Sequence, residues 1–515
     1  MAGVAKYILA LDQGTTSSRS ILYDLSGCEL AVANKPISVN FPSDGWVEQE
    51  ACEIWEAQLA TMREVCSGVE PASIAAIGIA NQRETLICWD PLDGKVLAPA
   101  IVWQCRRSSE ICSRLRRAGL QDEIGSISGL VLDPYFSASK ILWLQENVDG
   151  LRERMQLGRA VFGTVDSWLV YNLTKSKTSA PALVTESSNA SRTMLFSLKK
   201  TDWDDKLLEI FSLYRHNLPR IVASFGIFGR TSILGGGSEI PICGVLGDQQ
   251  ASLLGHGCIA SGSGKCTFGT GAFMLVNTGR EIVTSNEGLL SSVAWQMRGE
   301  VGRAAVEKGD CSYVVEGSVF MAGALIGWLR DGIGLISSSA ESELKASQVN
   351  DSSGVVVVPA FVGLGAPYWD DSARGIIVGL NRNVTANHIV RACLEGVAHQ
   401  VADLLECSGL SELRELNIDG GMSANEVFCQ ILADISQREV VVSSSAELTA
   451  LGAARAAAFG AGEFNSLEHA VESMLASGSG SAKPLRRFAA RKAESQVAVA
   501  RRRWKSAVER SRDWS

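Results

Sequence analysis

The feature that most constrains this chain is a polar Gly/Thr turn between two apolar runs, which occurs twice. The first turn, Asp12-Gln13-Gly14-Thr15-Thr16, separates the runs 7–11 and 20–23. The second, Gly269-Thr270-Gly271, interrupts the run from Cys266 to Val276. Each pattern predicts a strand, a tight turn and a second strand, with Gly14 supplying a positive φ. Two halves that begin alike suggest a pseudo-symmetric protein with a nucleotide between them, although a hairpin that binds nothing is the alternative.

A chain of 515 residues is too long for one core, so we expect two domains. The Gly/Ser-rich stretch 255–264 is the predicted junction, giving domains 1–255 and 256–515. Strand-like and helix-like runs alternate in the first half, which predicts an α/β fold. The expected strands are 7–11, 19–24, 74–80, 85–90 and 160–163, and the expected helices are 51–66, 107–118, 140–147 and 167–173.

Composition narrows the class of protein. The net charge of −8 argues against nucleic acid as the main partner. Thirteen cysteines without paired CxxC spacing favour thiols in a reducing compartment over a disulfide framework or zinc. No signal peptide precedes residue 14, and no run approaches the ~20 apolar residues of a membrane span, so we expect a cytoplasmic protein. The last 35 residues hold eleven Lys/Arg; a solvated helix packed by one face is favoured over a membrane or nucleic-acid surface.

Phosphate and metal chemistry is predicted at the first turn. Thr15, Thr16 and Ser17 offer hydroxyls and backbone N–H groups, which form a plausible nest for an anion. Asp12 leads into this turn and can hold a hard cation through oxygen. Asp248 lies between the apolar run 242–246 and a second apolar segment, and it is the candidate for proton handling.

A polyol site is predicted where polar residues follow the strand 74–80. Arg83 and Glu84 provide donors and an acceptor that match several hydroxyls, and a surface ion pair is the alternative. Trp103 and Tyr135 can pack a carbon chain or simply belong to the core. In the second half, the glycines after the run 413–418 allow close approach to a flat ligand, and Asn425 either caps a helix or contacts a nucleotide.

Taken together, these motifs resemble the FGGY carbohydrate kinases, most closely those that phosphorylate glycerol. The similarity runs from about residue 7 to about residue 460. It includes DQGTTSSR at 12–19, IANQRET at 79–85, IVWQCRR at 101–107, GLVLDPYFSASK at 129–140, NASRTMLF at 189–196, GDQQASLLG at 247–255, FGTGAFMLVNTG at 268–279 and VPAFVGLGAPYWDDSARG at 358–375. The resemblance implies two ribonuclease H-like domains, as in actin and the heat-shock ATPases, flanking a deep nucleotide and substrate cleft.

The same resemblance implies a role for each matching residue. The implied reaction is ATP-dependent phosphorylation of glycerol to sn-glycerol 3-phosphate in glycerol uptake and catabolism, with Asp248 as general base. Asp12 would help hold Mg²⁺, and Arg19 would stabilise the transferring group. The implied glycerol contacts are Arg83, Glu84, Trp103, Tyr135, Asp248, Gln249 and Phe273. The implied nucleotide contacts are Thr15, Thr16, Ser17, Arg19, Thr270, Gly271, Gly323, Gly421 and Asn425.

Three positions depart from the family pattern. Gly327 stands where many relatives have Gln near the nucleotide, and Cys266 where Asn is common. Glu239 stands where relatives inhibited by fructose 1,6-bisphosphate carry Arg, so we expect that control to be absent. A pentulose or larger-polyol kinase and an actin- or chaperone-like ATP-binding module are the competing hypotheses. Dimers and tetramers both occur in the family, and a homodimer is expected.

Overall fold

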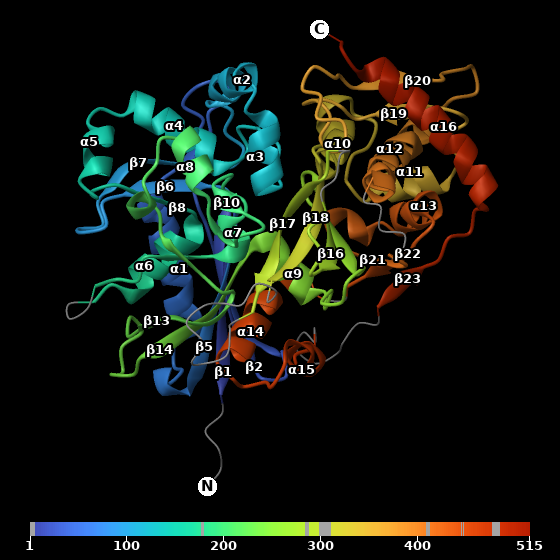
Figure 1. Ribbon diagram of the computed structural model, residues 1–515. Coiled ribbons are helices and arrows are strands. Elements are labelled where there is room, and N and C mark those ends of the chain that lie inside the picture. Colours follow the sequence, from blue (N-terminus) through green and yellow to red (C-terminus); the bar gives the residue numbers. More distant parts are fainter. Residues whose placement is uncertain are drawn as a thin grey trace.

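The computed structural model describes residues 6–176, 180–283, 288–297, 311–407, 413–443, 445, 447–475 and 485–514. Its strands and helices are arranged around two large sheets, one built from the first half of the chain and one from the second (Figure 1). The predicted α/β architecture of two like halves is confirmed.

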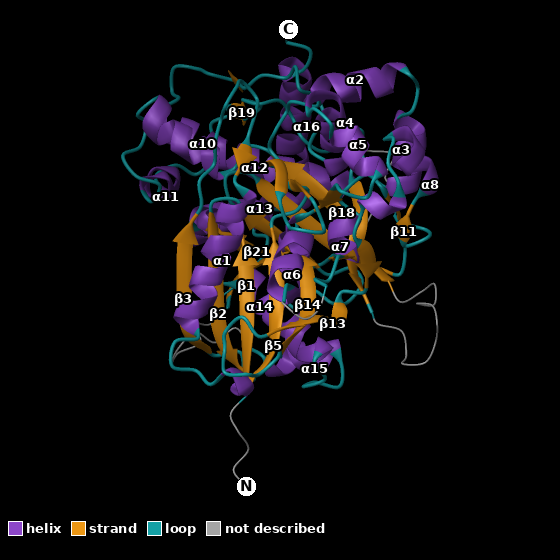
Figure 2. Ribbon diagram, turned by 90° about the vertical axis from the view of Figure 1, so that its left-hand side faces the viewer, coloured by secondary structure: helices purple, strands orange, loops and turns teal. Residues whose placement is uncertain are grey.

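The first sheet has the strand order β13-β14-β5-β1-β2-β3. β5 and β14 run parallel to β1, whereas β2, β3 and β13 are antiparallel to their neighbours. Figure 2 shows this sheet with α1 and α6 in front of it. The bounds are β1 Tyr7–Gln13, β2 Ser17–Asp24, β3 Glu29–Pro36, β5 Ile74–Asn81, β13 Phe225–Thr231, β14 Ile240–Gly247, α1 Ala51–Val65 and α6 Val165–Thr174.

Side chains of β1 alternate between two hydrophobic cores, because successive residues of a strand point to opposite faces. Leu9 and Leu11 pack with α1 and α6. Ile8 and Ala10 pack on the other face with α9 (Asp248–Gly255) and α14 (Leu448–Gly460). The sequence pattern of β1 therefore reflects burial on both sides.

Helix α14 comes from the second half of the chain yet covers the first sheet. It approaches so closely that a Cβ at Gly78 would lie 2.1 Å from the carbonyl oxygen of Ala453. A Cβ at Gly244 would lie 2.5 Å from the carbonyl carbon of Ala456. Glycines in the strands and alanines in the helix thus allow two layers to meet at short range, and the two halves share this layer.

The second sheet has the order β17-β18-β16-β15-β21-β22-β23. Its hairpin β15–β16 is antiparallel, and β15, β21 and β22 are parallel, which repeats the arrangement of β1, β2, β5 and β14. Helices α12 and α13 pack against it. The bounds are β15 Gly264–Phe268, β16 Ala272–Gly279, β17 Leu290–Gln296, β18 Cys311–Val319, β21 Glu415–Gly420, β22 Glu439–Val442, β23 Arg486–Phe488, α12 Ala386–Cys407 and α13 Glu426–Ser436.

The remaining elements surround these sheets. A smaller sheet has the order β4-β7-β6-β8, with strands Glu48–Gln49, Val96–Ile101, Leu86–Trp89 and Val161–Gly163. Short pairs are β9 Val184–Glu186 with β12 Arg220–Val222, β10 Phe196–Ser197 with β11 Asp202–Trp203, and β19 Val356–Val358 with β20 Ile376–Val378. The other helices are α2 Ser109–Arg117, α3 Gln121–Ser128, α4 Ser137–Asn147, α5 Leu151–Gln156, α7 Ser187–Ala190, α8 Asp205–Ile210, α10 Gly323–Gly327, α11 Glu341–Ser347, α15 Leu467–Ser473 and α16 Glu494–Ser511.

Within the basic C-terminal segment, α16 packs by one face, as expected, while residues 481–484 and 515 lie outside the described residues. Trp504 and Val508 are buried there, and the Trp504 Nε1 donates to Asp403 Oδ2 at 2.7 Å. Arg501 forms an ion pair with the same carboxylate. Among the residues that the structure describes, every helix is either too short or too polar to span a lipid bilayer. The thirteen cysteines occur as thiols.

Candidate active site

The first hairpin turn is held by side chains of its own half. The Gly14 N–H donates to Ser17 O at 2.9 Å, and the register pairs Asp12 with Arg19. The Trp103 Nε1 donates to Thr15 Oγ1 at 2.9 Å, while Thr16 is exposed. The expectation of a positive φ at Gly14 is wrong, because that conformation occurs elsewhere in the described chain and not at this residue. This tight loop closes through the bond to Ser17 instead.

Asp12 and Asp248 lie at the same edge of the first sheet, on either side of β5. The register places Asp12 beside Ala80 of β5, and Gly247 beside Asn81. Burial, the Asp248 carboxylate and Glu447 raise the pKa of Asp12 to about 7, against the opposing effect of Arg19. A cation bound beside these two neighbouring carboxylates would relieve the repulsion that raises the Asp12 pKa, so the pair fits a cation site.

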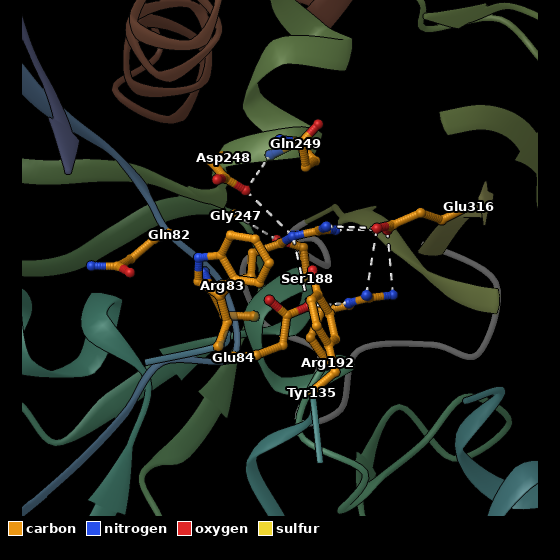
Figure 3. A network of polar contacts seen from close by, with 12 residues as sticks. Gln82, Arg83, Glu84, Tyr135, Ser188, Arg192, Gly247, Asp248, Gln249 and Glu316 are labelled. Atoms are coloured by element: carbon orange, nitrogen blue, oxygen red, sulfur yellow. Dashed lines mark hydrogen bonds and ion pairs between the residues drawn. The ribbon is translucent and has the colours of Figure 1, made fainter. Parts of the chain in front are cut away.

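Glycine and serine fix the turn that carries Asp248. The Gly247 N–H donates to Ser188 Oγ at 2.9 Å (Figure 3). The Ser188 hydroxyl donates in turn to Glu186 Oε2 at 2.5 Å. Asp248 begins α9, and its Oδ1 accepts from the Gln249 N–H at 2.7 Å. Burial raises the pKa of Asp248, although Arg83 and Lys265 oppose the shift. The Asp248 side chain remains 30% exposed, so it is accessible to a ligand.

Arg83 connects Asp248 to a buried cluster of charges. Its Nε lies 3.3 Å from Asp248 Oδ1 and 3.9 Å from Glu84 Oε1. Its Nη1 and Nη2 each donate to Glu316 at 2.7 Å. Arg192 approaches from the other side, with its Nε 2.6 Å from Glu84 Oε1 and its Nη1 3.3 Å from Glu316 Oε2 (Figure 3). The alternative of a surface ion pair at Arg83 and Glu84 is wrong, since both residues are buried.

Glu84 has a backbone φ of 58°, a region that L residues seldom adopt. Burial raises the pKa of its carboxyl, while Arg192 and Arg83 oppose that change. Glu316 behaves differently. Burial disfavours its charge as well, but Arg192 and Arg83 outweigh that cost and lower the Glu316 pKa to about 2.

Aromatic side chains from both halves flank this cluster. Trp103 meets Tyr135 edge-on, with ring centroids 5.5 Å apart, and meets Phe273 at 6.2 Å. Phe273 belongs to β16 of the second sheet, whereas the other two rings come from the first half. The structure therefore brings together the residues predicted to pack a carbon chain and those predicted to contact hydroxyls.

Gln249 is oriented by a buried lysine. Lys265 donates through Nζ to Gln249 Oε1 and, at 2.8 Å, to Thr267 Oγ1. With its oxygen engaged by an ammonium group, the Gln249 amide keeps its N–H groups for another acceptor. Burial lowers the pKa of Lys265, and nearby Asp419 opposes that change.

The second hairpin turn is joined to the start of α10 by its backbone. Ala324 N–H donates to Thr270 O at 3.0 Å, and Gly323 N–H to Gly269 O at 3.0 Å. A Cβ at Gly323 would lie 2.5 Å from Gly269 O, and one at Gly271 would lie 2.5 Å from Val319 O. Thr270 itself is exposed. Gly271 and Gly323 therefore let the backbone pack closely at this turn, and Thr270 stays accessible at its surface.

Two further predicted nucleotide positions, Gly421 and Asn425, lie just beyond the carboxyl end of β21. Gly420 has φ +86° and is packed against Phe268, whereas a Cβ at Gly421 would meet nothing within 4 Å. Asn425 caps α13, because its Oδ1 accepts from Phe428 N–H at 2.8 Å, and its Nδ2 donates to Ser342 Oγ at 3.2 Å. Arg19 forms an ion pair with Glu447. Of Gly420, Gly421 and Asn425, Gly421 is thus the residue with free space beside its Cα.

Sequence reasoning did not assign Arg192, Glu316 or Lys265 to the site. All three are fully buried charged residues. The sequence did offer one indication of Glu316, which is the only charged residue in the strand CSYVVEGSV. A carboxylate that is buried in a strand needs a cationic partner nearby.

Comparisons with known proteins agree on one family. Residues 7–255 match the N-terminal domain of the FGGY family of carbohydrate kinases, and residues 264–461 match its C-terminal domain. A glycerol kinase of Shewanella pealeana is 48% identical over 468 residues, which cover 90% of this chain and 92% of that protein. The crystal structure of Plasmodium falciparum glycerol kinase with ADP has a TM-score of 0.90 at 32% identity, with 98% of each chain covered. A xylulose kinase from Lactobacillus acidophilus, at 21% identity and TM-score 0.83, covers 98% of this chain and 97% of its own and shares the fold.

Proposed function

This chain belongs to the FGGY family of carbohydrate kinases, and on that premise we propose that it transfers the γ-phosphoryl group of ATP to glycerol. The product is sn-glycerol 3-phosphate. The observation that carries this proposal is the accessible Asp248 carboxylate beside Arg83, with Trp103, Tyr135 and Phe273 around it. The glycerol kinases that match about nine-tenths of the chain support the choice of substrate.

Glycerol is held by donors and acceptors that the buried cluster fixes in place. Arg83 and Gln249 supply N–H donors, while Glu84 and Asp248 supply carboxylate oxygens, so each hydroxyl finds a partner of either kind. The rings of Trp103, Tyr135 and Phe273 pack against its carbons. Their close mutual contacts favour a short triol over a larger sugar.

Asp248 acts as the general base. As the terminal hydroxyl oxygen of glycerol attacks the γ-phosphorus, its proton passes to the Asp248 carboxylate. A new O–P bond forms while the bond from the γ-phosphorus to the β,γ-bridging oxygen breaks, and ADP leaves. The raised Asp248 pKa makes this carboxylate a stronger base than an ordinary aspartate. Arg19 stabilises charge on the transferring group.

The phosphates of ATP extend between the two hairpin turns. In this proposal, Thr15, Thr16 and Ser17 of the first hairpin and Thr270 and Gly271 of the second bind the phosphates, and Gly323, Gly421 and Asn425 contact the nucleoside. The open space at Gly421 supports this assignment.

Asp12 is the residue that holds Mg²⁺, with Asp248 nearby. Mg²⁺ in kinases is bound by one or two carboxylates together with substrate phosphates and water, which suits this pair. In the described residues, no group of three or more His, Cys, Asp or Glu side chains is arranged to hold a metal alone. When bound, the ion neutralises phosphate charge.

The proposal also covers the oligomeric state of the protein and its cellular compartment. We propose a homodimer in the cytoplasm, where a reducing environment keeps the thirteen cysteines as thiols. Light scattering tests the oligomeric state, because a homodimer should have twice the 55.0 kDa mass of one protomer.

The test is ADP release with MgATP and a panel of acceptors: glycerol, dihydroxyacetone, xylulose, ribulose and none. Activity confined to glycerol and its triose analogues supports the proposal. Turnover only with a pentulose contradicts the substrate, and ATPase activity that ignores the acceptor contradicts the kinase assignment.

A further inference from the structure

We propose that Glu316 is a positioning residue for the glycerol site, which fixes the Arg83 guanidinium from the opposite half of the chain. This inference rests on the proposed function. Glu316 belongs to β18 in the second sheet, where it pairs with Leu275 and Leu290. Arg83 follows β5 in the first sheet.

The Arg83 guanidinium has two forked edges, and Glu316 occupies one of them. Its Nη1 and Nη2 donate to the two Glu316 oxygens at 2.7 Å each, which is a bidentate pair. Nη1 also donates to Gln250 Oε1 at 3.2 Å. The edge formed by Nε and the second Nη2 hydrogen therefore remains, and it faces Asp248 and Glu84. A substrate hydroxyl that binds Arg83 would therefore have to meet this edge, beside Asp248 and Glu84.

A buried carboxylate is costly unless it is paired, and Glu316 is the only charged residue of β18. Glu316 is fully buried, and Arg192 lies on its other side with Nη1 3.3 Å from Oε2. The same Arg192 donates through Nε to Glu84 at 2.6 Å. Glu316 thus holds Arg83 directly and links it to Glu84 through Arg192, so it orients two groups that are proposed to meet glycerol.

The location of Glu316 joins the two halves at this site. Phe273 also comes from the second sheet, where it pairs with Ser318, two residues beyond Glu316 on β18. The aromatic contact with Trp103 and the ion pair with Arg83 therefore both join the second sheet to residues of the first half of the chain. A change at Glu316 is expected to alter binding of glycerol more than binding of nucleotide.

The experiment compares Glu316→Gln, Glu316→Asp and the wild type in glycerol-dependent ADP release and in ATP-analogue binding. Loss of the charge weakens two charge-assisted bonds, so Glu316→Gln is expected to raise the glycerol KM about 10- to 100-fold. Glu316→Asp keeps the charge but is one methylene shorter, and a smaller increase is expected. The Kd of the ATP analogue should stay within about threefold.

Asp403→Asn is the matched control, because Asp403 is a buried carboxylate paired with Arg501 away from Arg83. It tests whether loss of any buried ion pair changes the glycerol KM, and it should leave that KM unchanged. A glycerol KM within twofold of the wild type in both Glu316 variants would overturn the proposal, as would equal losses of glycerol and nucleotide affinity. If Glu316→Gln does not fold, Glu316→Asp decides by the same criteria. Failure of the wild type to use glycerol would instead refute the proposed function.

Discussion

Replacement of Asp248 by Asn removes the base and changes almost nothing else in the site. Asn has the same shape, and its side-chain oxygen can still accept the Gln249 N–H bond that now spans 2.7 Å. The lost element is the negative charge on an accessible carboxyl that lies 3.3 Å from Arg83 Nε. We therefore expect a defect in turnover with little change in the fold.

The size of the defect follows from what a positioned base contributes. General base catalysis accelerates proton transfer about 10²- to 10⁴-fold, which is about 2.7 to 5.5 kcal/mol of barrier. Because Asp248 is the only base proposed for this step, Asp248→Asn should lower kcat by that factor. Nucleotide binding should change by less than about threefold, since the proposed nucleotide contacts lie elsewhere.

The assay is steady-state ADP release at saturating glycerol, with ATP-analogue affinity measured separately by calorimetry. Asp90→Asn is the matched control: Asp90 is also buried and pairs with Arg159 at 2.6 Å, but it has no role in the proposed site. The control should keep near-normal kcat. An Asp248→Asn enzyme with kcat within tenfold of the wild type would refute the assignment of the base.

The remaining predictions concern other parts of the molecule. Arg83→Ala should raise the glycerol KM about 10- to 100-fold, and an unchanged KM would count against this contact. Gly421→Ala should leave thermal unfolding unchanged, because its Cβ meets no atom within 4 Å, but raise the ATP KM about tenfold; a normal KM would remove Gly421 from the nucleotide site. Burial and Arg501 lower the pKa of His399 to about 3, so only the unfolded chain takes up this proton as pH falls below 6.5. Wild-type stability should therefore fall between pH 6.5 and 5 by up to about 1.4 kcal/mol per unit more than that of His399→Gln, and equal slopes in urea unfolding would contradict this. Because the exposed Glu239 repels an anion, a titration with fructose 1,6-bisphosphate should leave the rate unchanged, and clear inhibition would disprove that expectation.

Local sequence patterns predicted the strands and helices of the first half well. Expected strand 74–80 is β5, Ile74–Asn81, and expected helix 51–66 is α1, Ala51–Val65. The apolar residues of a strand recur at every second position, and those of a helix recur every three to four positions. Both patterns involve residues close together in the chain, so a single sequence is enough to detect them. Backbone conformation was harder to predict. Glycine at position 14 suggested a positive φ, but the turn closes without one.

Long-range partners could not be predicted in the same way. Arg83 and Glu316 are 233 positions apart, and they meet only because the two halves of the chain pack together at this site. Glu316, as the lone charged residue of its strand, indicated that some cation must be near, but not which one. The packing of α14 on the first sheet was equally hidden, although Gly78 and Ala453 are the small residues it needed.

A crystal structure with glycerol, Mg²⁺ and a non-hydrolysable ATP analogue tests the roles of Asp248, Arg83 and Glu84 most directly. We expect a terminal glycerol hydroxyl within hydrogen-bond distance of Asp248 and facing the γ-phosphate. We expect the other hydroxyls to contact Arg83 and Glu84. Glycerol bound away from Asp248, or a γ-phosphate on the far side of this carboxylate, would contradict it.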